Sequence, residues 1–535
     1  MNIRSLFFPA LVVCVRTALA DSADDTGFTA LKNALGPAML TGAGVGISQV
    51  EAEIVSGGIA DYLPQAGAGT FAGTGTWAGK TFTAKSDGGT VGAYSFHASE
   101  VALHIYGPNT QPSAHPFGWA SMAPAIPAVD MWLADKWNDE FLAPGDAAPI
   151  VEVRKVQNHA WVKSATAATA TAYKDLLRRQ DFAIHRDKYL CISALNNGET
   201  TAVPDQLAAA YNSLCTGLSN ALHSRGGTSS NMDGPGRRKP EIVVPVGATS
   251  YAAGYLSSAA SLLYEKAATL TSDAEDPRVI KAALMAGATK SEFSGWAKSS
   301  AHPIDTIYGA GELNIFNSHQ ILAGGEQAAD PTTNKPLAAW SYLSLAVNGS
   351  ATFRLNVPAG TYVTELSAAA AWHRQPRDTN SGSPFVLNHP VIANYNLTLL
   401  RDPAQGGTAV TIDSSSSTLY NFEHVWARNL PAGNYRLQLG RTNDGAENIP
   451  HACGIAWLVQ TAPHAPVPVM VRSGNSLTFS FNTLLTGQPY KFQSSINLTS
   501  WFDERSFTGG GVISNYTKKA AAGGGEYFRL LPVLP

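Results

Sequence analysis

The sequence is poor in charged side chains and has no strong excess of either sign. Charged residues make up 14% of the 535 residues, against about 25% in a typical soluble protein. Lys and Arg together number 37 and Asp and Glu number 40, so the formal net charge is −3. This balance argues against nucleic-acid binding through a basic surface, and against a polybasic membrane-surface protein.

Long hydrophobic runs are absent after the first 20 residues, so we expect no membrane span. Residues 1–20 combine Arg4, an apolar run at 6–15 and an Ala-Leu-Ala site before Asp21, which is the pattern of a cleaved signal peptide. A buried N-terminal helix is the alternative. The signal peptide predicts a protein that is secreted or periplasmic.

Cysteine is scarce as well. The chain has four cysteines, of which Cys14 lies in the predicted signal peptide. A Cys191–Cys215 disulfide and three free buried thiols, with Cys453 as the third, both remain open. No spacing of Cys and His resembles a zinc site. We expect no catalytic metal ion and no organic cofactor, whereas a structural calcium site stays open although no D-x-D-x-D-G loop is present.

The residues that are present describe a folded, turn-rich protein. Hydrophobic residues make up 44% of the chain, which excludes a disordered protein, and the 49 Gly and 31 Pro follow no Gly-X-Y period. At roughly 150 residues per domain, the length predicts about three or four domains.

Short apolar runs alternate with Ala-rich helical patterns between about residues 44 and 322. The runs that predict strands are 44–50, 148–157, 188–195 and 241–247. The segments that predict helices are 127–142, 171–184, 205–223, 250–270 and 276–288. This alternation predicts an α/β domain over residues 21–325, with a parallel sheet flanked by helices.

The pattern changes after residue 323. Short apolar runs separated by Pro, Gly, Asn and Asp turns predict a β-sandwich domain over residues 340–465. A Pro-rich joint follows at 462–469. Residues 466–535 predict a small all-β C-terminal module, with strands near 477–481, 490–495 and 526–533.

A serine at the start of a predicted helix is the clearest chemical signal. The segment KPEIVVPVGATSYAA joins a strand to a helix, with Ser250 in the turn. The unpaired N–H groups and the positive dipole end of a helix favour developing negative charge there. A plain N-cap role for Ser250 is the alternative. The segment resembles the serine block of the subtilisin-like serine proteases, although Ala248 is inserted and Gly254 replaces the usual proline.

Two upstream segments resemble the other catalytic blocks of that family, in the order acid, histidine, serine. In SFHASEVAL, His97 falls on the catalytic histidine. In GAGVGISQVEAEI, Glu51 falls where the family has aspartate, at the end of an apolar strand. The alternatives are a structural histidine and a surface glutamate. Glu53 and Glu100 are the next carboxylates to consider if Glu51 does not serve.

Two further segments resemble blocks that surround the substrate in this family. CISALNNGE resembles the oxyanion block, which implies that Asn196 donates to the oxyanion, although Asn-Gly after a strand is also a common turn. VQNHAWV resembles the strand that lines the substrate cleft. This resemblance implies substrate-binding roles for Asn158, Ala160 and Trp161, with Ala160 replacing a serine.

The resemblance covers about residues 40–325 and implies a subtilisin-like fold with serine endopeptidase activity. It implies that Ser250 attacks the peptide carbonyl, that His97 moves the proton, and that Glu51 orients His97. The substrates would be polypeptides, and we expect a monomer. Two alternatives stay open: a catalytically impaired scaffold with this fold, and a secreted binding or adhesion protein that works through its β domains.

Overall fold

The computed structural model describes residues 22–532 with short gaps. The gaps are residues 53, 57–58, 65–69, 73–76, 90–92, 109–120, 382–383, 389, 404–406, 444–448, 464–467, 482–483, 485–487, 498, 510–513 and 520–526. The predicted signal peptide, residues 1–20, and Glu53 therefore lie outside the described residues.

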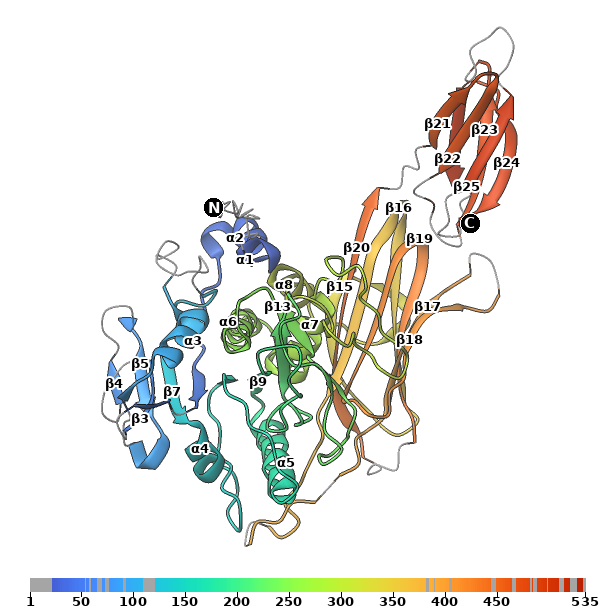
Figure 1. The fold of residues 1–535 in the computed structure, drawn as a ribbon. Coiled ribbons are helices and arrows are strands. Elements are labelled where there is room, and N and C mark those ends of the chain that lie inside the picture. The colour runs from blue at the N-terminus through green and yellow to red at the C-terminus, as the bar shows by residue number, and fades with distance from the viewer. Residues whose placement is uncertain are drawn as a thin grey trace, which may run out of the picture.

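The N-terminal region alternates strands and helices, as Figure 1 shows. Its strands are β1 (Ile47–Glu51), β2 (Ile54–Ser56), β3 (Ile59–Leu63), β4 (Thr70–Ala72), β5 (Thr81–Ala84), β6 (Ala93–Tyr94), β7 (Ala128–Leu133), β8 (Val156–His159), β9 (Leu190–Ala194), β10 (Leu214–Leu218), β11 (Gly226–Gly227), β12 (Arg238–Lys239) and β13 (Ile242–Val244). Its helices are α1 (Ser22–Asp25), α2 (Phe28–Leu35), α3 (Phe96–Tyr106), α4 (Ala134–Lys136), α5 (Ala170–Asp187), α6 (Thr249–Ala267), α7 (Pro277–Gly287) and α8 (Ile315–Ala323). Short turns of helix are η1 (Gly36–Ala38), η3 (Ser86–Gly89), η4 (Trp137–Phe141) and η5 (Ser272–Glu275).

Eight strands form the main sheet, in the order β13-β10-β9-β8-β1-β7-β5-β4. Neighbouring strands are parallel, except that β4 and β5 are antiparallel. β1 lies inside the sheet, where Ile47 pairs with Val129 of β7 and with Val156 of β8. Parallel strands end at one edge of a sheet, so the segments that follow β1, β9 and β13 emerge on the same side.

Helices cover both faces of this sheet, which confirms the predicted α/β fold. Ile47 belongs to a core cluster that includes residues of α3, α6 and α8, whereas Val50 belongs to a second cluster with Ile184 of α5. Successive residues of a strand point to opposite faces, so Gln49 and Glu51 share the face of Ile47. Glu51 is therefore directed toward the α3 side of the sheet.

Two segments predicted as helices contain strands instead. Residues 127–142 form β7 followed only by the short α4 and η4, and residues 205–223 contain β10. Both strands are buried between parallel neighbours, and this pairing overrides the helix preference of their alanine and leucine residues. The predicted strand 148–157 is also shorter, because regular pairing begins only at Val156.

The region after α8 is β-rich, as predicted. Its strands are β14 (Asp330–Lys335), β15 (Ala338–Leu345), β16 (Ser350–Trp372), β17 (Tyr395–Arg401), β18 (Val410–Ser415), β19 (Phe422–Arg441) and β20 (His451–Pro463). They join in one hydrogen-bonded sheet, in the order β15-β20-β16-β19-β17-β18, with β14 also paired to β16. The runs expected as separate strands merge into the long β16 and β19, whose pairing shifts register between Val357 and Tyr362.

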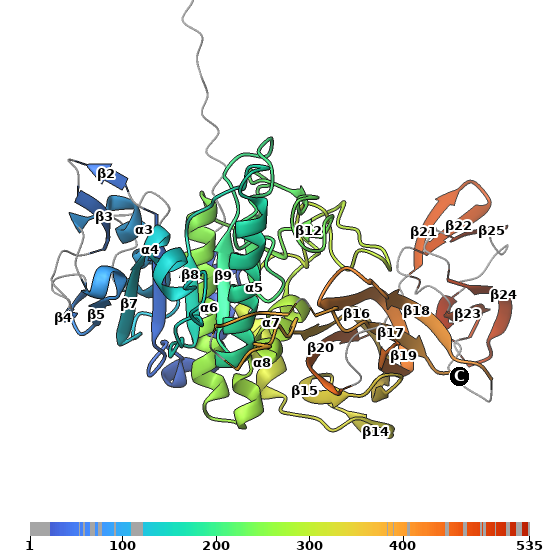
Figure 2. The same cartoon turned by 90° about the horizontal axis from the view of Figure 1, so that it is seen from below.

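The C-terminal module consists of two three-stranded antiparallel sheets. Its strands are β21 (Pro468–Ser473), β22 (Ser476–Phe481), β23 (Pro489–Ser495), β24 (Phe502–Thr508), β25 (Ser514–Lys519) and β26 (Tyr527–Pro532). A separate aromatic core that includes Phe479, Phe481 and Phe492 holds the two sheets together. Figures 1 and 2 both show this module beyond the seven-stranded sheet, away from the α/β domain.

The α/β domain and the seven-stranded sheet share a hydrophobic core. All residues of α7 are buried. Trp340, Phe422 and Ala456 of the sheet belong to the same cluster as Ile47 of β1. The two regions therefore pack directly against each other through this cluster.

The structure also describes the three cysteines after the predicted signal peptide, and the length and apolar character of the helices. Cys191, Cys215 and Cys453 are free and buried, so the disulfide that was left open does not form. The sheet register pairs Cys215 with Ser193 rather than with Cys191. Within the described part of the chain, no helix combines the length and the apolar character needed to cross a membrane.

Candidate active site

Glu51 and His97 are in contact, although 46 residues separate them. His97 Nδ1 lies 2.9 Å from Glu51 Oε2. Glu51 ends β1 and its side chain is 1% exposed, whereas the His97 side chain, in the first turn of α3, is 33% exposed. Ser95 caps α3 by accepting a hydrogen bond from the Ala98 N–H. The surface-glutamate alternative is therefore wrong, and the imidazole is held from its Nδ1 side.

The pKa of His97 is raised above its ordinary value by this contact. Burial acts to lower the pKa, but the hydrogen bond and the charge of Glu51, together with the charge of Glu100, outweigh burial. Among the contacts of the described residues, none occupies His97 Nε2. This nitrogen is the one that a proton-transfer role requires.

Ser250 is the second residue of α6 rather than its N-cap. The N-cap position belongs to Ala248, which makes no side-chain cap. Ser250 is 7% exposed, and neither its hydroxyl nor its backbone N–H has a partner among the hydrogen bonds of the described residues. The simple N-cap alternative is therefore wrong, and both groups remain available at the positive end of a 19-residue helix.

The beginning of α6 packs on α3, which carries His97. The Tyr251 ring stacks on the His104 ring with centroids 4.5 Å apart. Burial and the charge of Glu100 both raise the pKa of Tyr251, and the same Glu100 charge acts on His97. The first turn of α6 thus lies against the C-terminal half of α3, and Glu100, which is three residues after His97, acts on both His97 and Tyr251. No hydrogen bond joins Ser250 to His97 among the described contacts, and such bonds are often long in the absence of substrate.

Two asparagines follow β9, and they make different contacts. The Asn196 side-chain amide donates to the Ala202 carbonyl at 3.1 Å. Asn197 Oδ1 accepts hydrogen bonds from both the N–H and the hydroxyl of Thr249, at 2.9 and 3.1 Å. Asn197, which the sequence analysis treated only as part of a turn, therefore lies against the residue before Ser250. The only signal for it in the sequence is that the asparagine is repeated, since the N-x-G register of the family block selects Asn196.

The side chains of the predicted cleft strand are buried in the core. Asn158 is fully buried and donates to Ser257 Oγ at 3.0 Å. Trp161 is 6% exposed and packs edge-on against Trp137, and Ala160 is also 6% exposed. These side chains are part of the core, and the substrate-binding roles implied for Asn158, Ala160 and Trp161 stay predictions.

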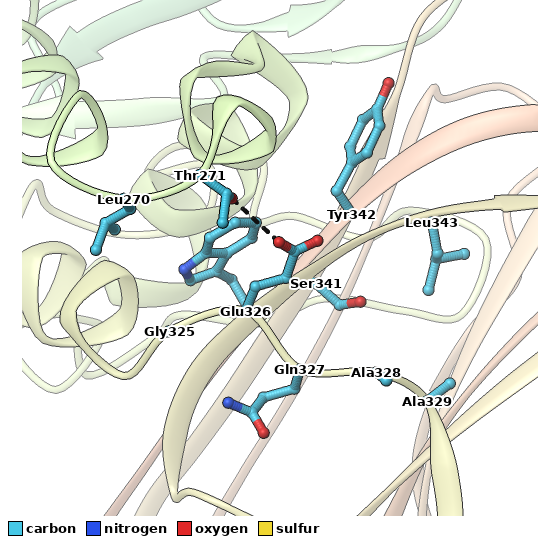
Figure 3. A pocket seen from close by; sticks show the side chains of 11 residues that line it. Leu270, Thr271, Gly325, Glu326, Gln327, Ala328, Ala329, Ser341, Tyr342 and Leu343 are labelled. Atoms are coloured by element: carbon cyan, nitrogen blue, oxygen red, sulfur yellow. Dashed lines mark hydrogen bonds between the residues drawn. The ribbon is translucent and has the colours of Figure 1, made fainter.

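A cavity of about 630 Å³ lies outside this site, between the end of α6 and the edge strand β15 (Figure 3). Its lining includes Leu270, Glu326, Trp340 and Tyr342, and none of the predicted site residues. Glu326 Oε2 accepts a hydrogen bond from Thr271 at 3.1 Å, as the dashed line in Figure 3 marks. Among the described residues, no group of three or more His, Cys, Asp or Glu could hold a metal ion.

Comparison with known proteins gives only distant similarity. No family model matches the sequence, and no curated protein matches it. The solved structures that are similar include several proteases, among them one related to subtilisin and one sedolisin. The MycP3 protease of a type VII (ESX-3) secretion system is 14% identical, with a TM-score of 0.34, over 55% of this chain and 87% of that chain.

Two further similar structures are also proteases with low sequence identity to this chain. Fervidolysin from Fervidobacterium pennivorans, a keratinolytic enzyme related to subtilisin, is 12% identical, with a TM-score of 0.32, over 93% of this chain and 69% of that one. Pseudomonas sedolisin, a serine-carboxyl proteinase, is 11% identical, with a TM-score of 0.35, over 56% and 98%. At these TM-scores, the assignment of an activity depends on the side chains of this protein.

Proposed function

We propose that this protein is a secreted, monomeric serine endopeptidase that cleaves polypeptides through an acyl-enzyme. The observation that carries the proposal is the 2.9 Å contact between His97 Nδ1 and Glu51 Oε2. A buried carboxylate on one ring nitrogen leaves the other nitrogen available as a general base. The position of Ser250 in the first turn of the neighbouring helix α6 supports its role as nucleophile.

In the proposed reaction, the Ser250 hydroxyl oxygen attacks the peptide carbonyl carbon while His97 Nε2 takes the hydroxyl proton. Glu51 holds the tautomer that carries hydrogen on Nδ1 and stabilises the imidazolium that forms. His97 then gives the proton to the leaving amine. Water, deprotonated by His97, hydrolyses the acyl ester and restores Ser250.

The tetrahedral intermediate carries a negative oxygen that needs hydrogen-bond donors. The Ser250 N–H at the start of α6 is one candidate donor. The second is a side-chain amide, from Asn196 as the sequence implies or from Asn197, which is bonded to Thr249. The helix dipole of α6 favours the same charge.

The first test is covalent labelling with a fluorophosphonate probe, which reacts only with an activated serine. We expect wild-type protein to be labelled at Ser250, and Ser250→Ala to lose labelling and several orders of magnitude in kcat. The variant should melt near the wild-type temperature, because the Ser250 hydroxyl has no partner among the described hydrogen bonds.

Ser272→Ala is the matched control, since Ser272 also begins a helical turn, η5, and is exposed. It should be labelled as wild type is. Peptidase activity of Ser250→Ala within tenfold of wild type would show that another group is the nucleophile. Absence of labelling in the folded wild-type protein would favour the catalytically impaired scaffold.

A further inference from the structure

A buried glutamine lies beside the acid of the candidate triad. Gln49 is on β1, two residues before Glu51 and on the same face, and it is fully buried. Its neighbours along the strand, Ile47 and Val50, are the apolar residues expected inside a parallel sheet. A buried amide is costly unless its hydrogen bonds are made, so a glutamine here calls for an explanation.

Both ends of the Gln49 amide are engaged. Gln49 Nε2 donates to Glu51 Oε1 at 2.8 Å and to the Ala98 carbonyl at 3.0 Å. The Tyr106 hydroxyl donates to Gln49 Oε1 at 2.6 Å. Both partners of Nε2 are acceptors and the partner of Oε1 is a donor, so only one orientation of the amide satisfies all three bonds.

Tyr106 is held as firmly as the glutamine. It is the last residue of α3 and is fully buried, with its ring edge-on to Trp77 at 5.4 Å and to Phe82 at 6.0 Å. Burial and the charge of Glu51 raise the pKa of Tyr106 well above its ordinary value, so the hydroxyl keeps the proton that it donates. Gln49 therefore ties β1 to both the first and the last turn of the helix that carries His97.

With these contacts, both oxygens of the Glu51 carboxylate have a hydrogen-bond partner. Oε2 faces His97 and Oε1 faces Gln49. A glutamate has one more rotatable bond than the aspartate of related enzymes, and a second donor on its other oxygen removes that freedom. We infer that Gln49 and Tyr106 are positioning residues: the chain Tyr106→Gln49→Glu51 holds the carboxylate in the rotamer that binds His97 Nδ1. This inference rests on the proposed function for its catalytic consequence.

The test compares Gln49→Met and Tyr106→Phe with wild type by NMR titration of the His97 imidazole, assigned with a His97→Gln variant. Loss of the relay frees Glu51 to turn away from His97, so the pKa of His97 should fall toward its ordinary value, more in Gln49→Met than in Tyr106→Phe. Tyr106→Phe keeps the ring and its aromatic packing, so it remains informative if Gln49→Met does not fold.

Kinetics provide the second readout. A hydrogen bond to a charged group corresponds to about 10- to 100-fold in rate, so we expect kcat to fall about 100-fold in Gln49→Met and about tenfold in Tyr106→Phe. KM should stay constant, and the acidic limb of kcat/KM should move to lower pH with the His97 pKa.

Ser99→Ala is the matched control, because Ser99 is a buried α3 residue that donates to the Pro64 and Ser95 carbonyls and not to Glu51. It should lose stability without moving the His97 pKa. A His97 titration that is the same in wild type and in both relay variants would overturn the inference, with or without activity. Absence of Ser250 labelling in wild type counts against the proposed function instead, while the titration still decides whether the relay positions Glu51.

Discussion

The acid that contacts His97 is a glutamate at the last position of a central strand. Its extra methylene relative to aspartate lengthens the reach from β1, and the first turn of α3 lies where Oε2 meets His97 Nδ1. The electrostatic effect follows from this geometry, since burial lowers the pKa of His97 but the bond and the charge of Glu51, with the charge of Glu100, raise it by more.

Glu51→Gln removes that charge while keeping the size of the side chain. Proton transfer needs neutral His97, so wild-type activity should rise with pH through a histidine pKa that lies above the ordinary value. In the variant, burial is the main influence on the pKa of His97, so the acidic limb of the kcat/KM profile should move to lower pH. The analogous loss in a serine-protease triad is about 10⁴-fold in kcat. The pH dependence of kcat/KM for both proteins is the measurement.

Glu51→Asp is the companion variant, because it keeps the charge and shortens the reach. It should retain partial activity, well above that of Glu51→Gln. The acidic limb of its kcat/KM profile should stay at a pH above the ordinary histidine pKa. Full activity of Glu51→Gln would mean that another carboxylate serves His97. Glu100, whose charge already acts on His97, would be the first to examine.

Asn196 and Asn197 provide a second prediction at the residue scale. If Asn197 is the oxyanion donor, Asn197→Ala should lower kcat about 10²- to 10³-fold with little change in KM. Asn196→Ala should have a small effect, because its amide is bonded to the Ala202 carbonyl. Steady-state kinetics of the two variants decide between them. The reverse ranking would restore Asn196, the residue that the sequence implies.

At the scale of elements, the site depends on how closely α3 and α6 approach. Gly254 is the residue that permits this approach, since a Cβ at this position would lie 3.0 Å from the Val101 carbonyl oxygen and 3.1 Å from His104 Cβ. Because His97 lies on α3 and Ser250 on α6, we expect the separation of the two helices to influence the distance between these residues.

Gly254→Val should therefore push α3 away from α6. Overpacking typically costs about 1–3 kcal/mol of stability. We expect a lower melting temperature together with a drop in kcat, measured by calorimetry and by peptide hydrolysis. Gly295→Val is the control, because a Cβ at Gly295 meets no atom within 4 Å. A Gly254→Val protein with wild-type kcat would show that this packing does not set the site.

At the scale of the whole molecule, the seven-stranded sheet completes the α/β domain. Helix α7 is buried along its whole length, between the parallel sheet and β20. Its Arg278 donates to the Tyr342 hydroxyl of β15 at 2.6 Å. Gly454 allows β20 to approach the backbone of α7 closely, since a Cβ at Gly454 would lie 2.6 Å from the Arg278 carbonyl carbon. We expect residues 22–463 to unfold as one cooperative unit.

Gly454→Ala tests this unit. The added methyl group meets backbone atoms of α7, which cannot move aside as a side chain can, so the cost should be about 1–3 kcal/mol. Calorimetry should show a lower transition for residues 22–463, and an unchanged transition for the C-terminal module, which has its own core. Gly440→Ala in β19 is the control, because a Cβ there meets nothing within 4 Å. A shift in both transitions, or in neither, would contradict this division.

Local sequence patterns were sufficient for most elements of the α/β domain. The segments around α5, α6 and α7 have helical periodicity, and those around β1, β9 and β13 are short buried runs, so their structure follows from near neighbours along the chain. The order of the segments that contain Glu51, His97 and Ser250 could also be read from the sequence. The residues of the contact between Glu51 and His97 were therefore predictable, although its 2.9 Å distance was not.

Other features were decided by tertiary packing. β7 and β10 are strands because they fill places between parallel partners, and the free Cys215 faces Ser193 because of the register of β9 and β10. Asn158 and Trp161 are buried by contacts with residues that are far from them in the sequence. The relay likewise connects Tyr106 of α3 to Gln49 and Glu51 of β1, which are far from it in the sequence. Periodicity records which face a residue occupies, whereas hydrogen-bond partners depend on how whole elements approach one another. For that reason the sequence determined the order and type of most elements, and only the folded chain determined that β7 and β10 are strands and which polar side chains meet.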